Sequence, residues 1–175
     1  MMKTNRPFLY LGLVLMTLSA PLYAASEYLL GAGDEINIRV YNEDDLSMRI
    51  MLDDTGTFDY PYLGVIKAKG KNVDRLKSEI TQGLLDDILI SPSVNISIVK
   101  YRDFYIDGEV KSPGGYPYQP GLTVKQAISL AGGVTEWASS SKFEILREGS
   151  NDAKPAENNT TVRPGDTVTI LEGLF

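Results

Sequence analysis

The chain has 175 residues, with 17 Lys and Arg against 23 Asp and Glu, and it contains no histidine and no cysteine. The absence of these two residue types excludes Ser-His and Cys-His nucleophilic catalysis, ordinary zinc sites and a disulfide scaffold. The formal net charge of −6 and the lack of a dense basic block argue against nucleic-acid binding, which needs clustered Lys and Arg to neutralise phosphates.

Residues 1–24 have the pattern of a secretory signal peptide. Lys3 and Arg6 precede the apolar segment Phe8–Leu18, and Ser19–Ala24 then supplies a breaker and small residues. We expect cleavage after Ala24 and export to the periplasm. A retained membrane anchor is the alternative, but the apolar segment is shorter than the roughly 18–20 residues that span a bilayer. No cysteine follows this segment, so we expect no lipid anchor.

Residues 25–100 predict a first small domain of mixed strands with one helix. Ile36, Ile38 and Val40 alternate with polar residues, which is typical of a half-buried strand. Gly33 and Asp34 form the turn that starts this strand. The other regular elements expected are a helix capped by Asn72, with Val73, Leu76, Ile80 and Leu84 on its apolar face, and an alternating strand at Ser93–Ile98.

Two turn signals lie between these elements. Asp53–Phe58 is typical of a hairpin turn, with Gly56 inside it. Tyr60–Ile66, which contains Gly64, predicts one short strand that is broken by Pro61. A proline removes a donor from the sheet, so we expect this strand at an edge or a bend.

Residues 101–175 predict a second small domain, which makes the whole chain an α+β protein. A strand at Phe104–Val110 precedes a helix that begins with a capping box of Thr123 and Gln126, and a further strand covers Lys142–Arg147. The polar segment Gly149–Thr161 is expected to be a mobile loop. Turns are expected at Gly108, Gly114, Gly115, Gly132, Gly133, Gly165 and Asp166, and the last two repeat the Gly-Asp start of the first strand.

Pairs of neighbouring carboxylates are the candidates for catalysis, namely Asp44-Asp45, Asp53-Asp54 and Asp86-Asp87. A glycosidase needs two carboxylates that face each other across the glycosidic bond. Adjacent residues on a strand point to opposite faces, so we interpret these pairs as solvated turns and helix ends. No loop with alternating oxygen ligands occurs, and we expect no metal and no cofactor.

Aromatic side chains are the candidates for binding. Trp137 follows the helix stop and has three possible uses, which are packing at the core or rim, contact with a neighbouring subunit, and stacking on a sugar ring. Packing is the simplest of the three. Tyr116 and Tyr118 flank a proline and are candidates for the same glycan or subunit contact, although hairpin packing is the simpler interpretation.

Two sets of motifs follow one another along the chain. The first set is Gly31–Ile38, Gly56–Gly64 and Ser91–Ile96, and the second is Gly108–Gly114, Ala131–Thr135 and Arg163–Ile170. The first set resembles the export domain of bacterial polysaccharide export proteins, the Wza-like family. The second set resembles the soluble-ligand-binding β-grasp (SLBB) domain that follows it in that family.

Together with the signal pattern at 1–24, this resemblance implies an export domain at 25–100 and an SLBB β-grasp domain at 101–175. It implies a non-enzymatic periplasmic protein that forms a homo-oligomeric ring and conducts capsule, exopolysaccharide or biofilm polymer toward the outer membrane. The implied partners are the polysaccharide, an inner-membrane chain-length regulator or co-polymerase, and an outer-membrane pore protein. The alternatives are a monomeric periplasmic glycan-binding module and a carboxylate-based carbohydrate-active enzyme.

The sequence differs from the larger relatives in three ways. It has no cysteine that could carry a lipid, it contains one SLBB repeat, and only Glu172–Phe175 follow the expected strand Thr167–Leu171. The larger relatives cross the outer membrane with a further amphipathic helix. We therefore expect a separate outer-membrane pore protein to act with this chain.

Overall fold

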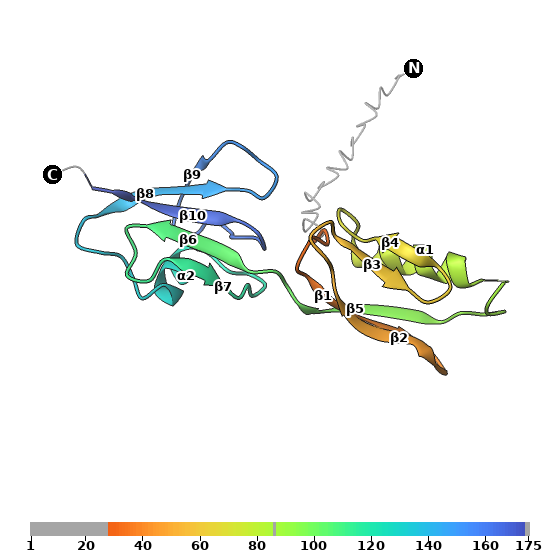
Figure 1. Cartoon of the computed structure of the whole chain (residues 1–175). Coiled ribbons are helices and arrows are strands. Elements are labelled where there is room, and N and C mark those ends of the chain that lie inside the picture. Colours follow the sequence, from red (N-terminus) through yellow and green to blue (C-terminus); the bar gives the residue numbers. More distant parts are fainter. Residues whose placement is uncertain (1–27, 86, 174–175) are drawn as a thin grey trace, which may run out of the picture.

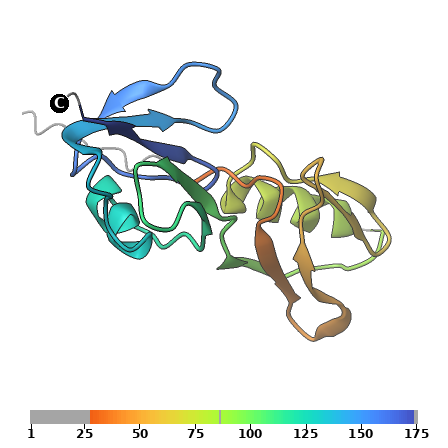
Figure 2. The same ribbon diagram turned by 60° about the vertical axis from the view of Figure 1, so that its left-hand side comes forward.

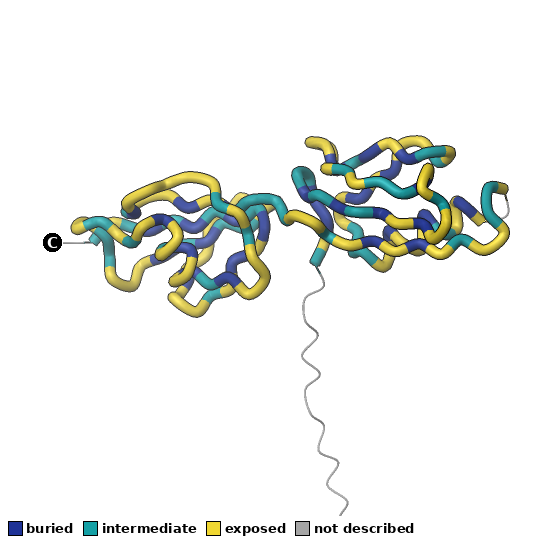
Figure 3. The backbone as a smooth tube through the Cα atoms, turned by 90° about the horizontal axis from the view of Figure 1, so that it is seen from below, coloured by how far each residue is buried: buried dark blue, intermediate teal, exposed yellow. Residues whose placement is uncertain are grey.

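The computed structural model describes residues 28–85 and 87–173, which form two regions that lie end to end (Figure 1). The N-terminal region comprises residues 28–100, and the C-terminal region comprises residues 101–173. Each region has its own apolar core, and Figure 3 shows buried segments in both. The expected signal peptide lies outside the described residues. Within the described part of the chain, no helix is long and apolar enough to span a bilayer.

An antiparallel three-stranded sheet forms the centre of the N-terminal region. Its order is β2-β1-β5, with β1 at Glu35–Val40, β2 at Glu43–Met51 and β5 at Val94–Lys100. Ile36 and Ile38 are fully buried, because alternate residues of a strand point to the same face. Val40 lies opposite Val94, so the beginning of β1 and the end of β5 meet at the other end of the sheet, next to the C-terminal region.

A hairpin and a helix complete this region. The hairpin consists of β3 (Thr57–Tyr60) and β4 (Gly64–Lys67), and the helix is α1 (Val73–Leu84). The Asn72 side chain accepts a hydrogen bond of 2.7 Å from the Arg75 N–H and so caps the helix as expected. Leu76, Ile80 and Leu84 are fully buried in the shared core, and Figure 2 shows α1 lengthwise beside the strands.

The β3–β4 hairpin corrects the prediction of a single broken strand at Tyr60–Ile66. The chain turns at residues 61–63, where Tyr62 has a φ of 64°, and it then reverses so that Asp59 lies opposite Val65. Pro61 therefore begins a reversal rather than a bend. The strand β2 was not predicted either, because its residues show no clear alternation and pairing with β1 holds it in place.

The C-terminal region is a five-stranded mixed sheet with one helix. Its order is β7-β6-β10-β8-β9, with β6 at Phe104–Gly108, β7 at Gly114–Tyr116, β8 at Ala138–Leu146, β9 at Lys154–Ala156 and β10 at Thr167–Glu172. The central strands β6 and β10 are parallel, and the other pairs are antiparallel. The helix α2 (Val124–Leu130) begins at the Thr123/Gln126 capping box and lies beside the sheet (Figure 2). The α+β class is confirmed, whereas the β-grasp assignment stays a prediction.

The segment Gly149–Thr161 differs from the expected mobile loop because it contains β9. This strand pairs with β8, and Ala156 lies opposite Phe143 and is buried. In addition, β8 begins at Ala138, before the predicted start at Lys142. Both differences have the same cause. These stretches are polar and carry little periodic signal, so pairing with a neighbouring strand determines their conformation.

Candidate functional site at the junction of the two regions

Two turns of the same construction meet where the two regions join. In the first, the Gly31 N–H donates to the Asp34 carboxylate (2.8 Å) and the Asp34 N–H donates to the Gly31 carbonyl (3.3 Å). In the second, the Arg163 N–H donates to the Asp166 carboxylate (2.6 Å) and the Asp166 N–H donates to the Arg163 carbonyl (3.2 Å). Both aspartates are buried, and they start β1 and β10. We refer to them as the first and the second Gly-Asp turn.

The carboxylate of Asp34 is fully buried and is surrounded by donors. Besides the Gly31 N–H, it accepts hydrogen bonds from the Tyr28 hydroxyl (2.6 Å), the Arg102 N–H (2.8 Å) and Arg102 Nη1 (3.0 Å). A buried charge persists only when it is paired and hydrogen-bonded in this way. Burial, followed by the hydrogen bond to Asp34, raises the pKa of Tyr28 far above its usual value, so this hydroxyl stays a donor.

Arg102 links the two regions. Its guanidinium binds Asp34 of the N-terminal region and also Glu148 of the C-terminal region, where Nε and Nη2 lie 2.7 Å and 2.5 Å from Oε2. The side chain is only 16% exposed, so these charges interact with little screening by solvent. Because one guanidinium serves two carboxylates, the junction is a charge-assisted network rather than a loose linker.

The linker around Arg102 is held on both sides. The Gly165 N–H donates to the Asp103 carbonyl (3.0 Å), and the Tyr105 N–H donates to the Asp166 carbonyl (2.8 Å), which attaches the linker to the second Gly-Asp turn. The Tyr101 ring packs edge-to-face against Tyr28 at 4.9 Å and against Tyr118 at 5.4 Å. The linker is therefore fixed by backbone hydrogen bonds and by aromatic packing.

The carboxylate of Asp166 accepts fewer hydrogen bonds than that of Asp34. It pairs with Arg147, whose Nη1 also donates to the Thr161 carbonyl (3.1 Å). Burial raises the pKa of Asp166, and the Arg163 N–H and the Arg147 guanidinium act in the opposite direction. Desolvation thus exceeds the stabilisation that these partners give to the charged form.

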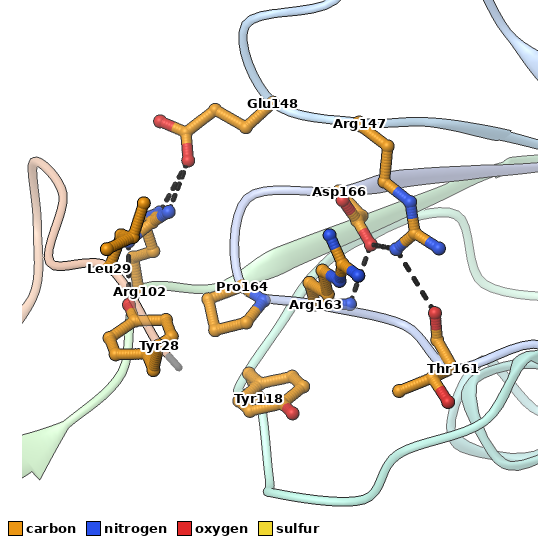
Figure 4. Close-up of a pocket in the computed structure, with 10 residues that line it drawn as sticks. All are labelled: Tyr28, Leu29, Arg102, Tyr118, Arg147, Glu148, Thr161, Arg163, Pro164 and Asp166. Atoms are coloured by element: carbon orange, nitrogen blue, oxygen red, sulfur yellow. Dashed lines mark hydrogen bonds and ion pairs between the residues drawn. The ribbon is translucent and has the colours of Figure 1, made fainter. Parts of the chain in front are cut away.

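A pocket of about 350 Å³ opens beside these two turns (Figure 4). Its wall carries three arginines and two carboxylates, together with aromatic rings from both regions. The charged residues are Arg102, Arg147, Arg163, Glu148 and Asp166, and the rings are those of Tyr28 and Tyr118. A pocket that combines charged groups with aromatic faces is suited to binding a small polar ligand.

The structure brings together four of the turn residues singled out by sequence, namely Gly33, Asp34, Gly165 and Asp166, at this junction. The others lie elsewhere: Gly56 and Gly64 flank the β3–β4 hairpin, Gly108, Gly114 and Gly115 lie on β6 and β7, and Gly132 and Gly133 follow α2. All of these glycines except Gly115 have positive φ. Sequence reasoning missed Tyr28, Arg102, Arg147 and Glu148, whose roles depend on contacts between distant segments.

Of the aromatic candidates, only Tyr118 lines the junction pocket. Tyr116 packs on Phe104 and donates from its hydroxyl to the Ser112 carbonyl (2.6 Å), as hairpin packing requires. Trp137 is 59% exposed, and its carbonyl accepts a hydrogen bond from the Gly173 N–H (2.7 Å) at the opposite end of the sheet. Their use in glycan or subunit contact stays a prediction.

The paired carboxylates do not form a catalytic arrangement in the described residues. Asp44, Asp45, Asp54 and Asp87 are exposed, and Asp86 lies outside the described residues. The Asp53 carboxylate accepts hydrogen bonds from Thr55 and Thr57 within its own turn, and these bonds lower its pKa to about 2. Within the part of the chain that the structure describes, no group of three metal-ligating side chains occurs.

Comparison with known proteins shows to which family the chain belongs. Residues 22–99 match the family of polysaccharide biosynthesis/export proteins, and residues 104–155 match the SLBB domain. The chain belongs to the polysaccharide biosynthesis/export family. This family consists of non-enzymatic export components, in agreement with the expectation that the chain is not an enzyme. The two matches lie on either side of the linker that carries Arg102.

Three curated relatives share this family. The chain is 32% identical to the exopolysaccharide production protein ExoF of Rhizobium meliloti over 71% of this chain and 32% of that protein. It is 29% identical to the EPS I polysaccharide export outer membrane protein EpsA of Ralstonia nicotianae over 74% of this chain and 41% of that protein. It is 25% identical to the polysialic acid transport protein KpsD of Escherichia coli over 53% of this chain and 16% of that protein. The chain thus spans less than half the length of these relatives.

Proposed function

We propose that this chain is a non-enzymatic, periplasmic component of a polysaccharide export machine and that it is not lipidated. The observation that carries the proposal is the pair of family matches, which follow one another along residues 22–99 and 104–155. Relatives named for exopolysaccharide production and polysaccharide export support it. The pocket supports a binding role, because the two carboxylates on its wall, Glu148 and Asp166, are each paired with an arginine.

We also propose that copies of the chain assemble into a ring. Three connections lie at the end of the N-terminal region away from the junction, namely β1–β2, β3–β4 and α1–β5 (Figure 1). They carry Tyr41, Tyr62 and Ile90, which are 74%, 77% and 94% exposed. Large apolar side chains that gather at one end of a molecule mark contact surfaces. This distal end is therefore our candidate for contact between subunits.

The proposal extends to domain boundaries and partners. We place the boundary between the export domain and the SLBB β-grasp domain at residues 100–101, where the linker begins. The proposed partners are the polysaccharide, an inner-membrane chain-length regulator, and an outer-membrane pore protein that docks on the C-terminal region. Crosslinking in whole cells tests these partners, since the pore protein should be recovered with this chain, and its loss should stop surface polymer while this chain remains present.

A deletion experiment tests the export role. Removal of the gene should abolish surface polysaccharide, and the wild-type chain supplied in trans should restore it. Polymer or its repeat units should accumulate inside the outer membrane of the deletion strain, because synthesis does not need an export component. Unchanged surface polysaccharide in the deletion strain would contradict the proposal. Cleavage of the purified polymer by the purified chain would contradict the non-enzymatic part.

Solution mass tests the ring. Sedimentation of the purified chain over a range of concentrations should show a species larger than the monomer. Tyr62→Ser and Ile90→Ser should shift it toward the monomer, whereas Leu130→Ser, on an exposed position of α2, should leave the mass unchanged. A monomer at all concentrations, or equal behaviour of the three variants, would count against the distal end as the contact surface.

A further inference from the structure

One arginine in the junction pocket has a guanidinium without a hydrogen bond or close ion pair among the described residues. Arg102 is engaged by Asp34 and Glu148, and Arg147 is engaged by Asp166 and by the Thr161 carbonyl. Arg163 lines the pocket and is exposed, and its guanidinium makes no hydrogen bond or close ion pair in the described part of the chain. Its charge acts on Asp166 and Tyr118 only through space. The chain as a whole is acidic, so a positive group placed in a pocket is a specific feature.

Arg163 is held at a fixed place by its backbone. Its N–H donates to the buried carboxylate of Asp166, its carbonyl accepts from the Asp166 N–H, and the buried Pro164 follows it. Figure 4 shows the Arg147 and Arg163 guanidinium groups on either side of the Asp166 carboxylate. The anchored backbone therefore fixes the point on the pocket wall from which the Arg163 side chain extends.

Tyr118 provides a flat apolar surface in the same pocket. Its ring is half-buried and packs edge-to-face on Tyr101 at 5.4 Å, which fixes its orientation. A sugar ring presents C–H groups on its faces, and these pack on aromatic rings in the manner of other apolar groups. The Glu148 carboxylate is a hydrogen-bond acceptor on the opposite wall, where it can accept from sugar hydroxyls.

We propose that the junction pocket binds a sugar residue that carries a carboxylate. The Arg163 guanidinium pairs with that carboxylate in a forked geometry, Tyr118 contacts the ring face, and Glu148 accepts from a hydroxyl. The inference rests on the proposed export function and names the polymer class as an acidic polysaccharide. A pocket of about 350 Å³ is near the lower end of small-molecule sites, which span roughly 300–1,000 Å³, and this favours a single sugar ring.

A carboxylate fits this pocket better than a phosphate does. Glu148 and Asp166 place two carboxylates on the wall, and they repel a dianionic phosphate more strongly than a singly charged group. An acidic peptide side chain would satisfy Arg163 but would leave the tyrosine face and the Glu148 acceptor unused. The combination of charge, ring face and acceptor therefore favours the acidic sugar.

The test measures binding to the purified full chain by calorimetry and by amide chemical-shift changes. The probes are methyl β-glucuronoside, the neutral methyl β-glucoside and inorganic phosphate. We expect the glucuronoside to bind about tenfold more tightly than either of the others, because hydrogen bonds to charged groups exceed neutral ones by about that factor. Arg163→Gln should remove this advantage, Arg163→Lys should retain part of it, and Arg75→Gln on α1 is the matched exposed control.

Several outcomes would overturn the inference. These are equal affinity for the charged and the neutral sugar, tighter binding of phosphate, equally tight binding of a glutamate-containing peptide, and an Arg163→Gln variant that folds as the wild type and binds the glucuronoside unchanged. The export role fails separately. If Arg163→Gln leaves binding intact while gene deletion still removes surface polymer, only this inference is lost, whereas surface polymer in the deletion strain removes the export role itself.

Discussion

The two Gly-Asp turns are built alike and used differently. In each, a buried aspartate accepts a hydrogen bond from the N–H three residues earlier and then starts a strand. That earlier residue is Gly31 in the first turn and Arg163 in the second. A Cβ on Gly31 would lie 2.5 Å from Arg102 Nη1, so the missing side chain leaves the space that the linker arginine occupies.

This difference shows how one local structure can serve either cohesion or binding. At the first turn, Arg102 covers the aspartate and joins the two regions through Glu148. At the second turn, the paired arginine is Arg147, which follows β8 within the same region, and the side chain of Arg163 faces the pocket. We therefore expect damage to the first turn to affect folding and damage to the second to affect binding.

The largest expected effect is that of Asp34→Asn. The amide replaces the carboxylate that accepts from Tyr28, Gly31 and Arg102, and it leaves the guanidinium without its buried partner. We expect a loss of about 3–5 kcal/mol in the free energy of unfolding, measured with urea. Asp166→Asn should cost less, because burial already raises the pKa of Asp166 and disfavours its charged form. Equal losses would contradict the difference between the turns.

Gly108→Ala should destabilise the C-terminal region. Gly108 has a φ of 75°, and a Cβ there would lie 2.2 Å from the Ile170 carbonyl oxygen on β10, a backbone atom that cannot move aside. We expect a loss of about 2–3 kcal/mol. Fluorescence of Trp137, the single tryptophan, follows the unfolding of this region.

Gly173→Ala is the control for that measurement. A Cβ at Gly173 would lie 3.4 Å from its nearest atoms, the carbonyl oxygens of Trp137 and Ala138, which is an ordinary contact distance. If Gly108→Ala unfolded with the same midpoint as Gly173→Ala, the close packing of β6 on β10 would be wrong. The loss of stability measured by Trp137 fluorescence is to be compared with the loss measured by amide hydrogen exchange in α1. A smaller loss in α1 would show that the two regions unfold separately.

A smaller effect is expected from Gly31→Ala. The new methyl group would displace the Arg102 guanidinium from Asp34 and from Glu148, and we expect this to cost about 1–2 kcal/mol. Arg163→Ala, at the equivalent position of the second turn, should stay within about 0.5 kcal/mol of the wild type because its exposed side chain makes no hydrogen bond or close ion pair in the described residues. Urea unfolding of the pair measures the contrast directly, and a reversed order would refute it.

The smallest effect concerns an exposed aspartate, as a contrast to the two buried ones. Hydrogen bonds from Thr55 and Thr57 lower the pKa of Asp53 to about 2. A lowered pKa means that its contribution to stability is present above the ordinary value near 4 and is lost as the pH falls toward 2. The carboxyl carbon resonance of Asp53 should titrate near pH 2, and Thr57→Ala should move the midpoint upward. A midpoint near 4 in the wild type would refute the turn geometry.

Much of the local structure could be predicted from the sequence. Alternation of Ile36 and Ile38 gave β1, Asn72 gave the start of α1, and the Thr123/Gln126 capping box gave α2. Each of these signals comes from residues within one or two turns of each other, so neighbouring sequence is enough to produce it. The motif order also pointed to the correct family.

The sequence by itself thus determined the α+β class, several of its strands and helices, the two Gly-Asp turns and the family. Only the tertiary structure decided that the turns meet, that Arg102 pairs with Asp34 from 68 residues away, and that β9 forms from a polar segment. The physical reason is that a hydrogen-bonded turn or a cap is specified by adjacent residues. A buried ion pair between distant residues depends instead on strand register and on the path of the linker, which no local pattern encodes.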